Sequence, residues 1–258
     1  MGGSRMSSNI LITGGGGFLG RYTARCLRKA GNNVTILGRN SYPWALKEGF
    51  NTIQSDICDR PGLINAFKGF DEVHHMAAKT GISVFWRPFY EINVRGTENV
   101  ISACMENGIR KLIYTSSPSV VYGAGNQDMI DETKPYPEKY LSHYSRSKAM
   151  AEQLVLSANK PGGKLLTVAL RPHLIWGPED TNLIPRLVTR SEKNRLFIIG
   201  NAANKVDVTY VENAAMAQLL SSEKLKEGST VCGKAYFITN DEPVLLWDFI
   251  NRVLACAG

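Results

Sequence analysis

The folded part of the chain opens with a glycine-rich turn, ILITGGGGFLG (10–20), placed directly after a short run of β-forming residues. Such a turn between a strand and a helix lets a pyrophosphate approach the backbone at the helix N-terminus. The glycines fit two spacings, GxxGxxG from Gly14 through Gly17 to Gly20, and GxGxxG starting at Gly15. A flexible loop would contain similar glycines, so the structural context decides. In that context the predicted cofactor contacts are Gly14, Gly17, Phe18, Leu19 and Gly20.

The segments after this turn alternate between strand-like and helix-like patterns. Strands are predicted at 10–13, 33–38, 52–56, 72–78, 111–117 and 165–172, and helices at 18–30, 60–68, 88–107 and 143–158. Short apolar strands separated by helices imply βαβ units, which build a parallel sheet covered on both faces. The sequence therefore predicts an α/β fold, a Rossmann-type doubly wound parallel sheet, and places the glycine turn after its first strand.

Composition excludes several other classes of protein. Five cysteines lie far apart with no CxxC pair, which argues against a disulfide framework and predicts no metal site. The net charge of +7 is scattered rather than gathered in a basic block, so no nucleic-acid partner is expected. No apolar run reaches the roughly 18 residues that span a bilayer, and no secretory signal is visible. We therefore expect a cytoplasmic protein with no obligatory membrane contact.

The end of the second predicted strand, ILGRN, bears on the choice of cofactor. NAD enzymes place an acidic residue there for the ribose 2′-hydroxyl, whereas an arginine can pair with the 2′-phosphate of NADP. Gly38 stands where the acid would be and Arg39 follows, so NADP(H) is favoured over NAD(H), unless Arg39 is only a solvated loop cation. After the third strand, Asp56 could reach the adenine amine, with Ile57 packed on the ring.

The segment HYSRSKAMAEQLV carries the candidate catalytic pair, Tyr144 and Lys148. Four residues apart, they share one face of a helix. A phenol has a reference pKa of about 10, and a nearby ammonium stabilises its anion, so Tyr144 could exchange a proton with a carbinol or carbonyl oxygen. An ordinary amphipathic helix would also contain YxxxK. The strand end YTSSPSVVYG supplies a hydroxyl, Ser117 or else Ser116, that could hydrogen-bond the substrate oxygen.

Taken together, these motifs resemble those of the extended short-chain dehydrogenases/reductases. The resemblance covers nearly the whole chain, through TGGGGFLG, SDICD, HHMAA, NVRGTENV, TSSPSVVYG, YSRSK and LRPHLIWGP. Within that superfamily the chain is similar to the branch of 3β-hydroxysteroid and sterol-4-carboxylate dehydrogenases. The pattern ALRPHLIWGPEDTNLIPRL, followed by NKVDVTYVENAA, most resembles the β-keto acid reductases of bacterial long-chain olefin biosynthesis.

The resemblance implies a role for each matching residue. Ser117 would polarise the carbonyl, Tyr144 would donate or accept the proton, and Lys148 would lower the tyrosine pKa while binding the nicotinamide ribose. Asn93 would support the site. The further residues that the resemblance places along the cofactor are Ala77, Ala78, Lys79, Pro172, His173 and Leu174. His173 is not expected to be a catalyst, because the tyrosine fills that role.

The domain organisation follows from the same comparison. A dinucleotide-binding domain is expected over 8–174, with 205–225 returning to it, and a small C-terminal substrate lobe over 175–204 and 226–258. Family members usually continue for several tens of residues, so the lobe is expected to be either truncated or minimal. The resemblance also suggests a homodimer through helices 88–107 and 143–158.

The resulting functional prediction is an NAD(P)-dependent oxidoreductase that interconverts a 3-hydroxy and a 3-keto group. Its small-molecule substrate would be hydrophobic, either a long-chain β-keto or β-hydroxy acid or a 3β-hydroxysteroid. Two alternatives stay open. One is a nucleotide-sugar epimerase or dehydratase, which would keep its cofactor tightly bound. The other is a non-catalytic NADP-binding scaffold, against which the complete set of serine, tyrosine and lysine argues.

Overall fold

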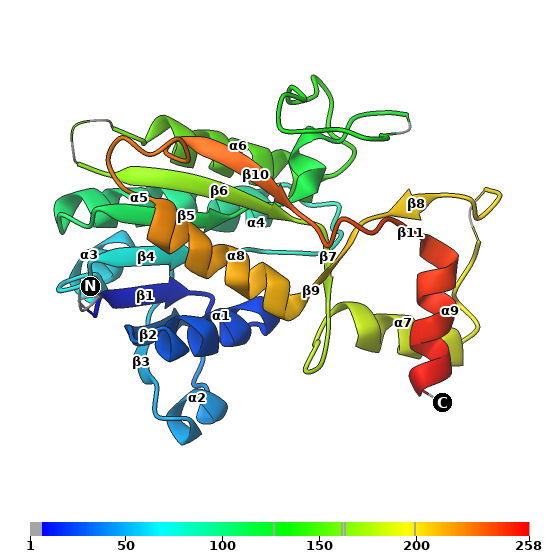
Figure 1. The fold of residues 1–258 in the computed structure, drawn as a ribbon, viewed down its shortest axis with the longest axis horizontal. Helices are drawn as coiled ribbons and strands as arrows, with labels where there is room; N and C mark the ends of the chain where they lie inside the picture. The colour runs from blue at the N-terminus through cyan, green and yellow to red at the C-terminus, as the bar shows by residue number, and fades with distance from the viewer. Residues whose placement is uncertain (1–6, 126, 161, 163, 199, 258) are drawn as a thin grey trace, which may run out of the picture.

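A computed structural model describes residues 7–125, 127–160, 162, 164–198 and 200–257. Its centre is a seven-stranded sheet in which every strand pair is parallel, in the order β10-β6-β5-β4-β1-β2-β3 (Figure 1). The strands are β1 (Asn9–Thr13), β2 (Asn33–Gly38), β3 (Asn51–Gln54), β4 (Glu72–His75), β5 (Lys111–Thr115), β6 (Leu166–Pro172) and β10 (Lys234–Ile238). This arrangement confirms the predicted doubly wound α/β fold.

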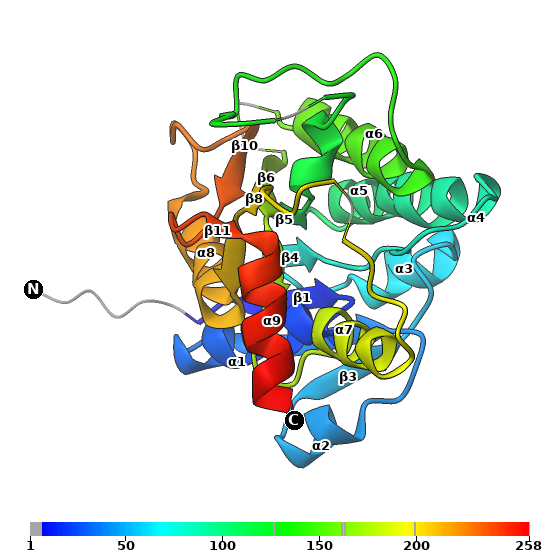
Figure 2. The same cartoon turned by 90° about the vertical axis from the view of Figure 1, so that its right-hand side faces the viewer.

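Helices cover both faces of the sheet (Figure 2). One face carries α3 (Arg60–Ala66), α5 (Gly96–Glu106) and α6 (His143–Ser157), and the other carries α1 (Phe18–Lys29) and α8 (Val211–Lys224). Shorter helical segments are α2 (Pro43–Lys47), α4 (Arg87–Phe89), the π-helix η1 (Tyr90–Arg95) and the 3₁₀ helix η2 (Pro118–Val121).

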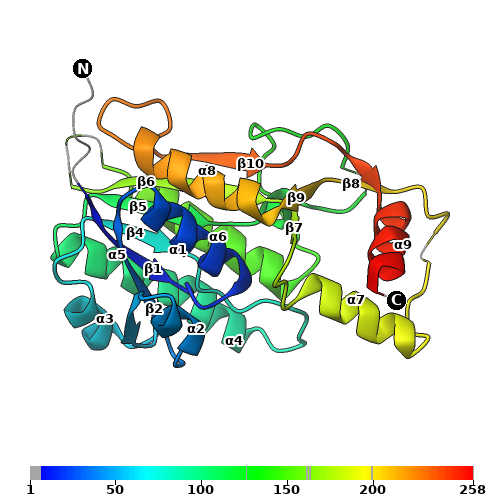
Figure 3. The same cartoon turned by 60° about the horizontal axis from the view of Figure 1, so that its bottom comes forward.

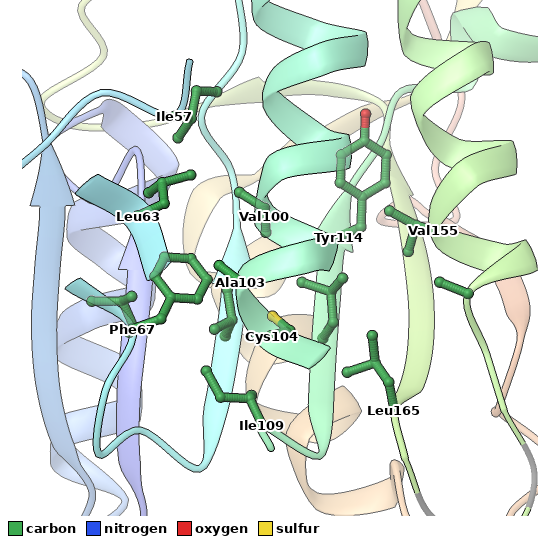
Figure 4. Close-up of a cluster of buried hydrophobic side chains, with 14 of the residues drawn as sticks. Ile57, Leu63, Phe67, Val100, Ala103, Cys104, Ile109, Tyr114, Val155 and Leu165 are labelled. Atoms are coloured by element: carbon green, nitrogen blue, oxygen red, sulfur yellow. The ribbon is translucent and has the colours of Figure 1, made fainter. Parts of the chain in front are cut away.

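The inner strands are buried on both sides because their side chains alternate between apolar clusters on the two faces of the sheet. Along β1, Leu11 points into the cluster beneath α3, α5 and α6, whereas Ile10 and Ile12 point into the cluster beneath α1. All three side chains are fully buried. Figure 4 shows the first cluster, where Phe67 meets residues of α5 such as Cys104. A strand with this two-sided burial must be central, as β1 is.

Several predicted elements have different boundaries in the structure; the strand predicted at 52–56 is β3, which ends at Gln54, and the helix predicted at 60–68 is α3, which ends at Ala66. The strands predicted at 72–78 and 111–117 end at His75 and Thr115, because the residues that follow leave the sheet and line a cavity. The helix predicted at 88–107 is a succession of α4, η1 and α5 with a π-helical turn in the middle. That turn contains Asn93, which makes tertiary hydrogen bonds described below.

The C-terminal part of the chain builds a small lobe beyond the carboxyl ends of the strands (Figures 1 and 3). Its described residues form two two-stranded sheets and two helices: β7 (Leu174–Trp176), β9 (Val208–Tyr210), β8 (Lys205–Val206), β11 (Val244–Leu245), α7 (Leu183–Glu192) and α9 (Leu246–Ala257). No helix among the described residues is long and apolar enough to cross a membrane.

The segment expected to return to the nucleotide domain contains α8, which packs beside α1. Within the range assigned to the lobe, 226–258, strand β10 pairs with β6 and forms an edge of the main sheet. Its inward residues complete an apolar cluster with Leu170. Ile199 and Gly258, also in the predicted lobe, lie outside the described residues. The exact division into domains stays a prediction.

Candidate active site

A cavity of about 800 Å³ lies at the carboxyl ends of the central strands. Its floor includes the point between β1 and β4 where the strand order reverses, which is where open α/β sheets bind their ligands. Fifteen predicted site residues line this cavity: Gly14, Gly17, Phe18, Leu19, Gly20, Arg39, Asp56, Ile57, Ala77, Ala78, Lys79, Ser117, Tyr144, Lys148 and Pro172. Asn93, His173 and Leu174 are not in its lining.

The glycine turn over residues 14–20, called the glycine cradle below, presents its backbone to the cavity. Gly14 has a φ of +72° and its N–H donates to Leu37 O over 2.9 Å. A Cβ built on Gly20 would lie 2.6 Å from Gly14 O, so a side chain there would force the turn apart. No side chain of the described residues caps α1 at Gly17, which leaves the N–H groups of its first turn for a ligand. These features fit the pyrophosphate of a dinucleotide.

Gly38 is closed to any side chain by Tyr42. A Cβ on Gly38 would run into the Tyr42 hydroxyl, and a Cβ on Gly16 would run into its ring. An acidic residue therefore has no room at Gly38 with Tyr42 in place. Arg39, the next residue, is exposed at the cavity, and its carbonyl oxygen accepts a hydrogen bond of 2.8 Å from Gln54.

The adenine-side residues predicted after β3 also face the cavity. Asp56 Oδ1 accepts a hydrogen bond from Cys58 N over 2.9 Å, which fixes the carboxylate. Ile57 is buried and packs against Gly96 of α5, where a Cβ would come within 2.7 Å of Ile57 Cδ1. Ile57 is thus held as an apolar wall at this end of the cavity.

Tyr144 lies in the first turn of α6, a helix whose N-cap Ser142 accepts a hydrogen bond from Ser145 N. Burial raises the pKa of the Tyr144 phenol, and a hydrogen bond with the Ser117 hydroxyl acts in the opposite direction. The net direction is upward, so the phenol is protonated at neutral pH in this structure. It is therefore suited to donate a proton.

Two serines follow β5 with different surroundings. Ser117 Oγ lies 2.9 Å from Ser119 Oγ and accepts a hydrogen bond from Ser119 N, capping η2. Ser116 Oγ is buried without a hydrogen-bond partner among the described residues, and Ser116 also lines the cavity. Both hydroxyls are thus close to the cavity, and the alternative between them stays open.

Lys148 is buried one turn after Tyr144. Its Nζ donates to Thr115 O over 2.7 Å and lies 4.1 Å from the centroid of the Tyr114 ring. Burial lowers the pKa of Lys148 to about 7, although the Glu152 carboxylate acts to raise it. The amine is thus held in one place, at the border between its two protonation states at neutral pH.

Asn93 forms hydrogen bonds with two segments next to the cavity. Its side-chain amide exchanges hydrogen bonds with the main chain of Lys79, accepting from the N–H over 2.7 Å and donating to the carbonyl over 3.0 Å. The same amide donates to Ser147 Oγ on α6 over 2.9 Å. Asn93 therefore connects the loop beside the cofactor cradle to the helix that carries Tyr144 and Lys148.

His173 and Leu174 lie just beyond the cavity, because the chain turns from β6 into β7 at this point. The His173 ring packs on Phe237, with centroids 5.6 Å apart, and burial lowers its pKa. Leu174 is exposed at the start of β7, whereas its neighbour Ile175 lines the cavity.

The sequence reasoning missed the residues that the lobe brings to the cavity: Ile175, Asp180, Asn182, Leu183 and Arg186. Asp180 accepts hydrogen bonds from the N–H groups of Asn182, Leu183 and Ile184 and so starts α7. An aspartate before an apolar helical run is a readable start signal. It predicts the helix, but not that the helix faces the nucleotide domain.

A doubly wound sheet with this cradle and a serine, tyrosine and lysine at one cavity defines an oxidoreductase of the extended short-chain dehydrogenase/reductase class. The chain belongs to the 3-beta hydroxysteroid dehydrogenase/isomerase family, with a match over residues 11–258. This is a family of dehydrogenases and reductases that act on CH–OH groups and typically use NAD(P).

The most informative relatives are two reductases and a dehydrogenase. A 2-alkyl-3-oxoalkanoate reductase from Stenotrophomonas maltophilia is 43% identical over 96% of this chain and 76% of the relative. Its counterpart from Shewanella oneidensis is 40% identical over 97% of this chain and 66% of the relative. The human sterol-4-alpha-carboxylate 3-dehydrogenase, decarboxylating, is 39% identical over 94% of this chain and 65% of the relative. The chain therefore spans only about two thirds of the length of the last two.

Solved structures share the fold over nearly the whole chain. MoeE5 in complex with UDP-glucuronic acid and NAD has a TM-score of 0.81 at 25% identity, covering 97% of this chain and 82% of that one. The UDP-glucose 4-epimerase of Thermus thermophilus in complex with NAD has a TM-score of 0.77 at 25% identity, and the match covers 96% of this chain and 81% of that one.

Proposed function

We propose that this protein is an NADP(H)-preferring reductase of a hydrophobic substrate, interconverting its 3-keto and 3-hydroxy groups. The observation that carries the proposal is that Ser117, Tyr144 and Lys148 line the same cavity as the glycine cradle. The bound NADPH would supply the hydride. The names of the relatives point to β-keto acids and sterol acids as candidate substrate classes.

In this mechanism Tyr144 donates a proton to the oxygen of the ketone as it is reduced. The raised pKa of the phenol keeps that proton available at neutral pH. Ser117, or Ser116, donates a hydrogen bond to the same oxygen, on which negative charge develops. Lys148, anchored on Thr115 O, would hold the nicotinamide ribose and, when protonated, would stabilise the phenolate that the transfer leaves behind.

The test is NADPH consumption with a panel of long-chain β-keto acids, a 3-ketosteroid and a UDP-sugar. Wild type is compared with Tyr144→Phe and with Tyr140→Phe, a tyrosine outside the cavity lining. General acid catalysis contributes roughly 100- to 10,000-fold, so Tyr144→Phe should lose that factor on one ketone class while Tyr140→Phe retains activity. NADPH binding with no reduction of any ketone would contradict the proposal.

The preference for NADP(H) is supported by Arg39 and by Tyr42, which leaves no room for an acid at Gly38. A charge-assisted hydrogen bond is worth about 1.5–3 kcal/mol, so Arg39→Ala should weaken NADPH binding by roughly 10- to 100-fold and leave NADH binding unchanged. Lys47→Ala, an exposed cation on α2, is the control. An equal effect on both cofactors would show that Arg39 does not bind the 2′-phosphate.

A second candidate function is favoured by the structural neighbours that hold UDP-sugars or act on them. A nucleotide-sugar epimerase uses the same hydride chemistry and keeps its cofactor bound through the cycle. Turnover of a UDP-sugar without added NADPH would support this alternative and would displace the ketone reductase.

A further inference from the structure

A chain of buried polar side chains runs across the sheet face beneath α8. Glu72 and His74 project from β4, Thr115 from the end of β5, and Gln218 and Ser222 from α8. All of these side chains except that of Thr115 are almost fully buried. Because buried polar groups persist only when they are hydrogen-bonded, such a chain is costly to keep and its geometry is closely constrained.

The hydrogen bonds form a continuous path from Glu72 on β4 to the cavity. Ser222 Oγ donates to Glu72 Oε2 over 2.9 Å, and His74 Nε2 lies 2.7 Å from Glu72 Oε1. His74 Nδ1 lies 2.9 Å from Gln218 Oε1, and Gln218 Nε2 donates a hydrogen bond to Thr115 Oγ1 over 2.8 Å. Thr115 itself lines the cavity.

The Glu72 end of this path is anchored by charge. Burial alone would raise the pKa of Glu72, but the hydrogen bond from His74 and the nearby Lys111 hold it below its ordinary value. Glu72 is thus an anion that can only accept hydrogen bonds, so His74 Nε2 carries a proton. The imidazole ring is therefore fixed, and its other nitrogen presents a defined position to Gln218.

Thr115 connects this path to the opposite face of the sheet. Its hydroxyl is held by Gln218, on the α8 face, while its carbonyl oxygen accepts the Nζ hydrogen bond of Lys148 from α6. Strand β5 ends at Thr115, and the chain leaves the sheet after Ser116 N, which donates to Leu170 O. The hydrogen bond from Gln218 to the Thr115 hydroxyl therefore restrains the last residue of β5. This is the residue whose carbonyl oxygen accepts the hydrogen bond of Lys148.

We propose that Gln218 is a positioning residue for Lys148 that acts through Thr115. The amide suits this place because it offers a donor and an acceptor to two partners at once, His74 and the Thr115 hydroxyl. The inference rests on the proposed function, in which Lys148 holds the nicotinamide ribose. It assigns to α8, a helix that contributes no side chain to the cavity lining in the described residues, a part in orienting the catalytic lysine.

The test uses substitutions that separate hydrogen bonding from packing. Thr115→Val removes the hydroxyl and keeps the shape, Thr115→Ser keeps the hydroxyl and loses the methyl group, and Gln218→Met removes the amide at nearly equal length. The readouts are the Kd of NADP⁺, measured by tryptophan fluorescence without turnover, and kcat and KM for ketone reduction. Ser221→Ala is the control, because its hydroxyl donates within α8, to Ala217 O.

Misplacement of a catalytic group by ~1 Å can cost about 100-fold, so we expect Thr115→Val and Gln218→Met each to lower kcat by at least about 10-fold. Both should weaken NADP⁺ binding and leave the KM of the ketone nearly unchanged. Thr115→Ser and Ser221→Ala should stay within about twofold of wild type, and the double variant Thr115→Val/Gln218→Met should be no worse than either single one.

Three outcomes would overturn the proposal. A normal Thr115→Val with an impaired Thr115→Ser would mean that packing alone matters, and effects that multiply in the double variant would mean that the two residues act separately. A loss in Ser221→Ala equal to that in Gln218→Met would reduce the effect to helix stability. If Gln218→Met does not fold, the two Thr115 variants still decide. If wild type reduces no ketone, the proposed function fails, while the NADP⁺ affinities still test the positioning.

Discussion

Removal of the Glu152 carboxylate is the perturbation whose consequence the structure defines best. Glu152 lies on α6 one turn after Lys148 and has no exposed surface. Its carboxylate accepts hydrogen bonds from Arg171 Nη2 over 2.6 Å, from Arg171 Nε over 3.0 Å and from the Tyr136 hydroxyl over 2.6 Å. Glu152→Ala would leave the Arg171 guanidinium, 3% exposed, without a counterion in the interior.

The magnitude follows from the burial of both partners. Breaking a buried ion pair from one side costs about 3–5 kcal/mol, because the remaining charge is left without compensation. A typical native domain has a free energy of unfolding of about 5–15 kcal/mol, so Glu152→Ala should remove a large part of it. Tyr136→Phe removes the hydroxyl that donates to Glu152 but leaves both charges paired, so it should cost about 1 kcal/mol. The double variant Glu152→Leu/Arg171→Met removes both charges and should recover most of the loss.

The assay is urea unfolding followed by tryptophan fluorescence and circular dichroism for wild type, Glu152→Ala, Glu152→Leu, Arg171→Met, the double variant and Tyr136→Phe. The reasoning predicts strong coupling, with the double variant more stable than either single charge deletion. Two results would refute it: a single-variant loss no greater than that of Tyr136→Phe, or losses that simply add in the double variant. Either would mean that water compensates the charge that the structure shows as buried.

Two further perturbations test the cradle and the lysine. Gly20→Ala should abolish NADPH binding while the protein stays folded, because its Cβ would lie 2.6 Å from Gly14 O. The control is Gly108→Asn, at an open position with φ +68°, which should bind NADPH normally. Calorimetric titration of both variants checks this, and normal binding by Gly20→Ala would show that the glycine turn does not bind the cofactor. Burial lowers the pKa of Lys148 in the folded state to about 7, below its ordinary value in the unfolded chain. Between about pH 7 and 10 the unfolded state therefore binds more protons than the folded state. The free energy of unfolding of wild type should thus rise with pH by up to about 1.4 kcal/mol per pH unit. Lys148→Met lacks this contribution, so its stability relative to wild type should fall as pH rises; urea unfolding at pH 7, 8 and 9 measures the difference, and a constant difference would argue against a buried amine.

The sequence by itself determined the features that depend on local spacing. The glycines of 10–20, the alternation of strands and helices, and the placing of Tyr144 and Lys148 on one helical face all follow from periodicities of a few residues. The resemblance to a family then assigned roles to residues whose own pattern is uninformative, such as Ala77 and Pro172. The structure brings both of these to the cavity.

Other features were decided only by the tertiary structure, because they depend on residues that are distant in the chain. Gln218 meets His74 across 144 positions, and Glu152 meets Arg171 between a helix and a strand. Tyr42 closes Gly38 from the loop after β2, which no spacing rule predicts. Neither the protonation of Tyr144 nor the anchoring of Lys148 can be read from the spacing of the two residues along the helix, since burial sets both. Periodicity specifies which elements form, whereas packing decides which side chains are removed from water, and the chemistry of this site depends on that removal.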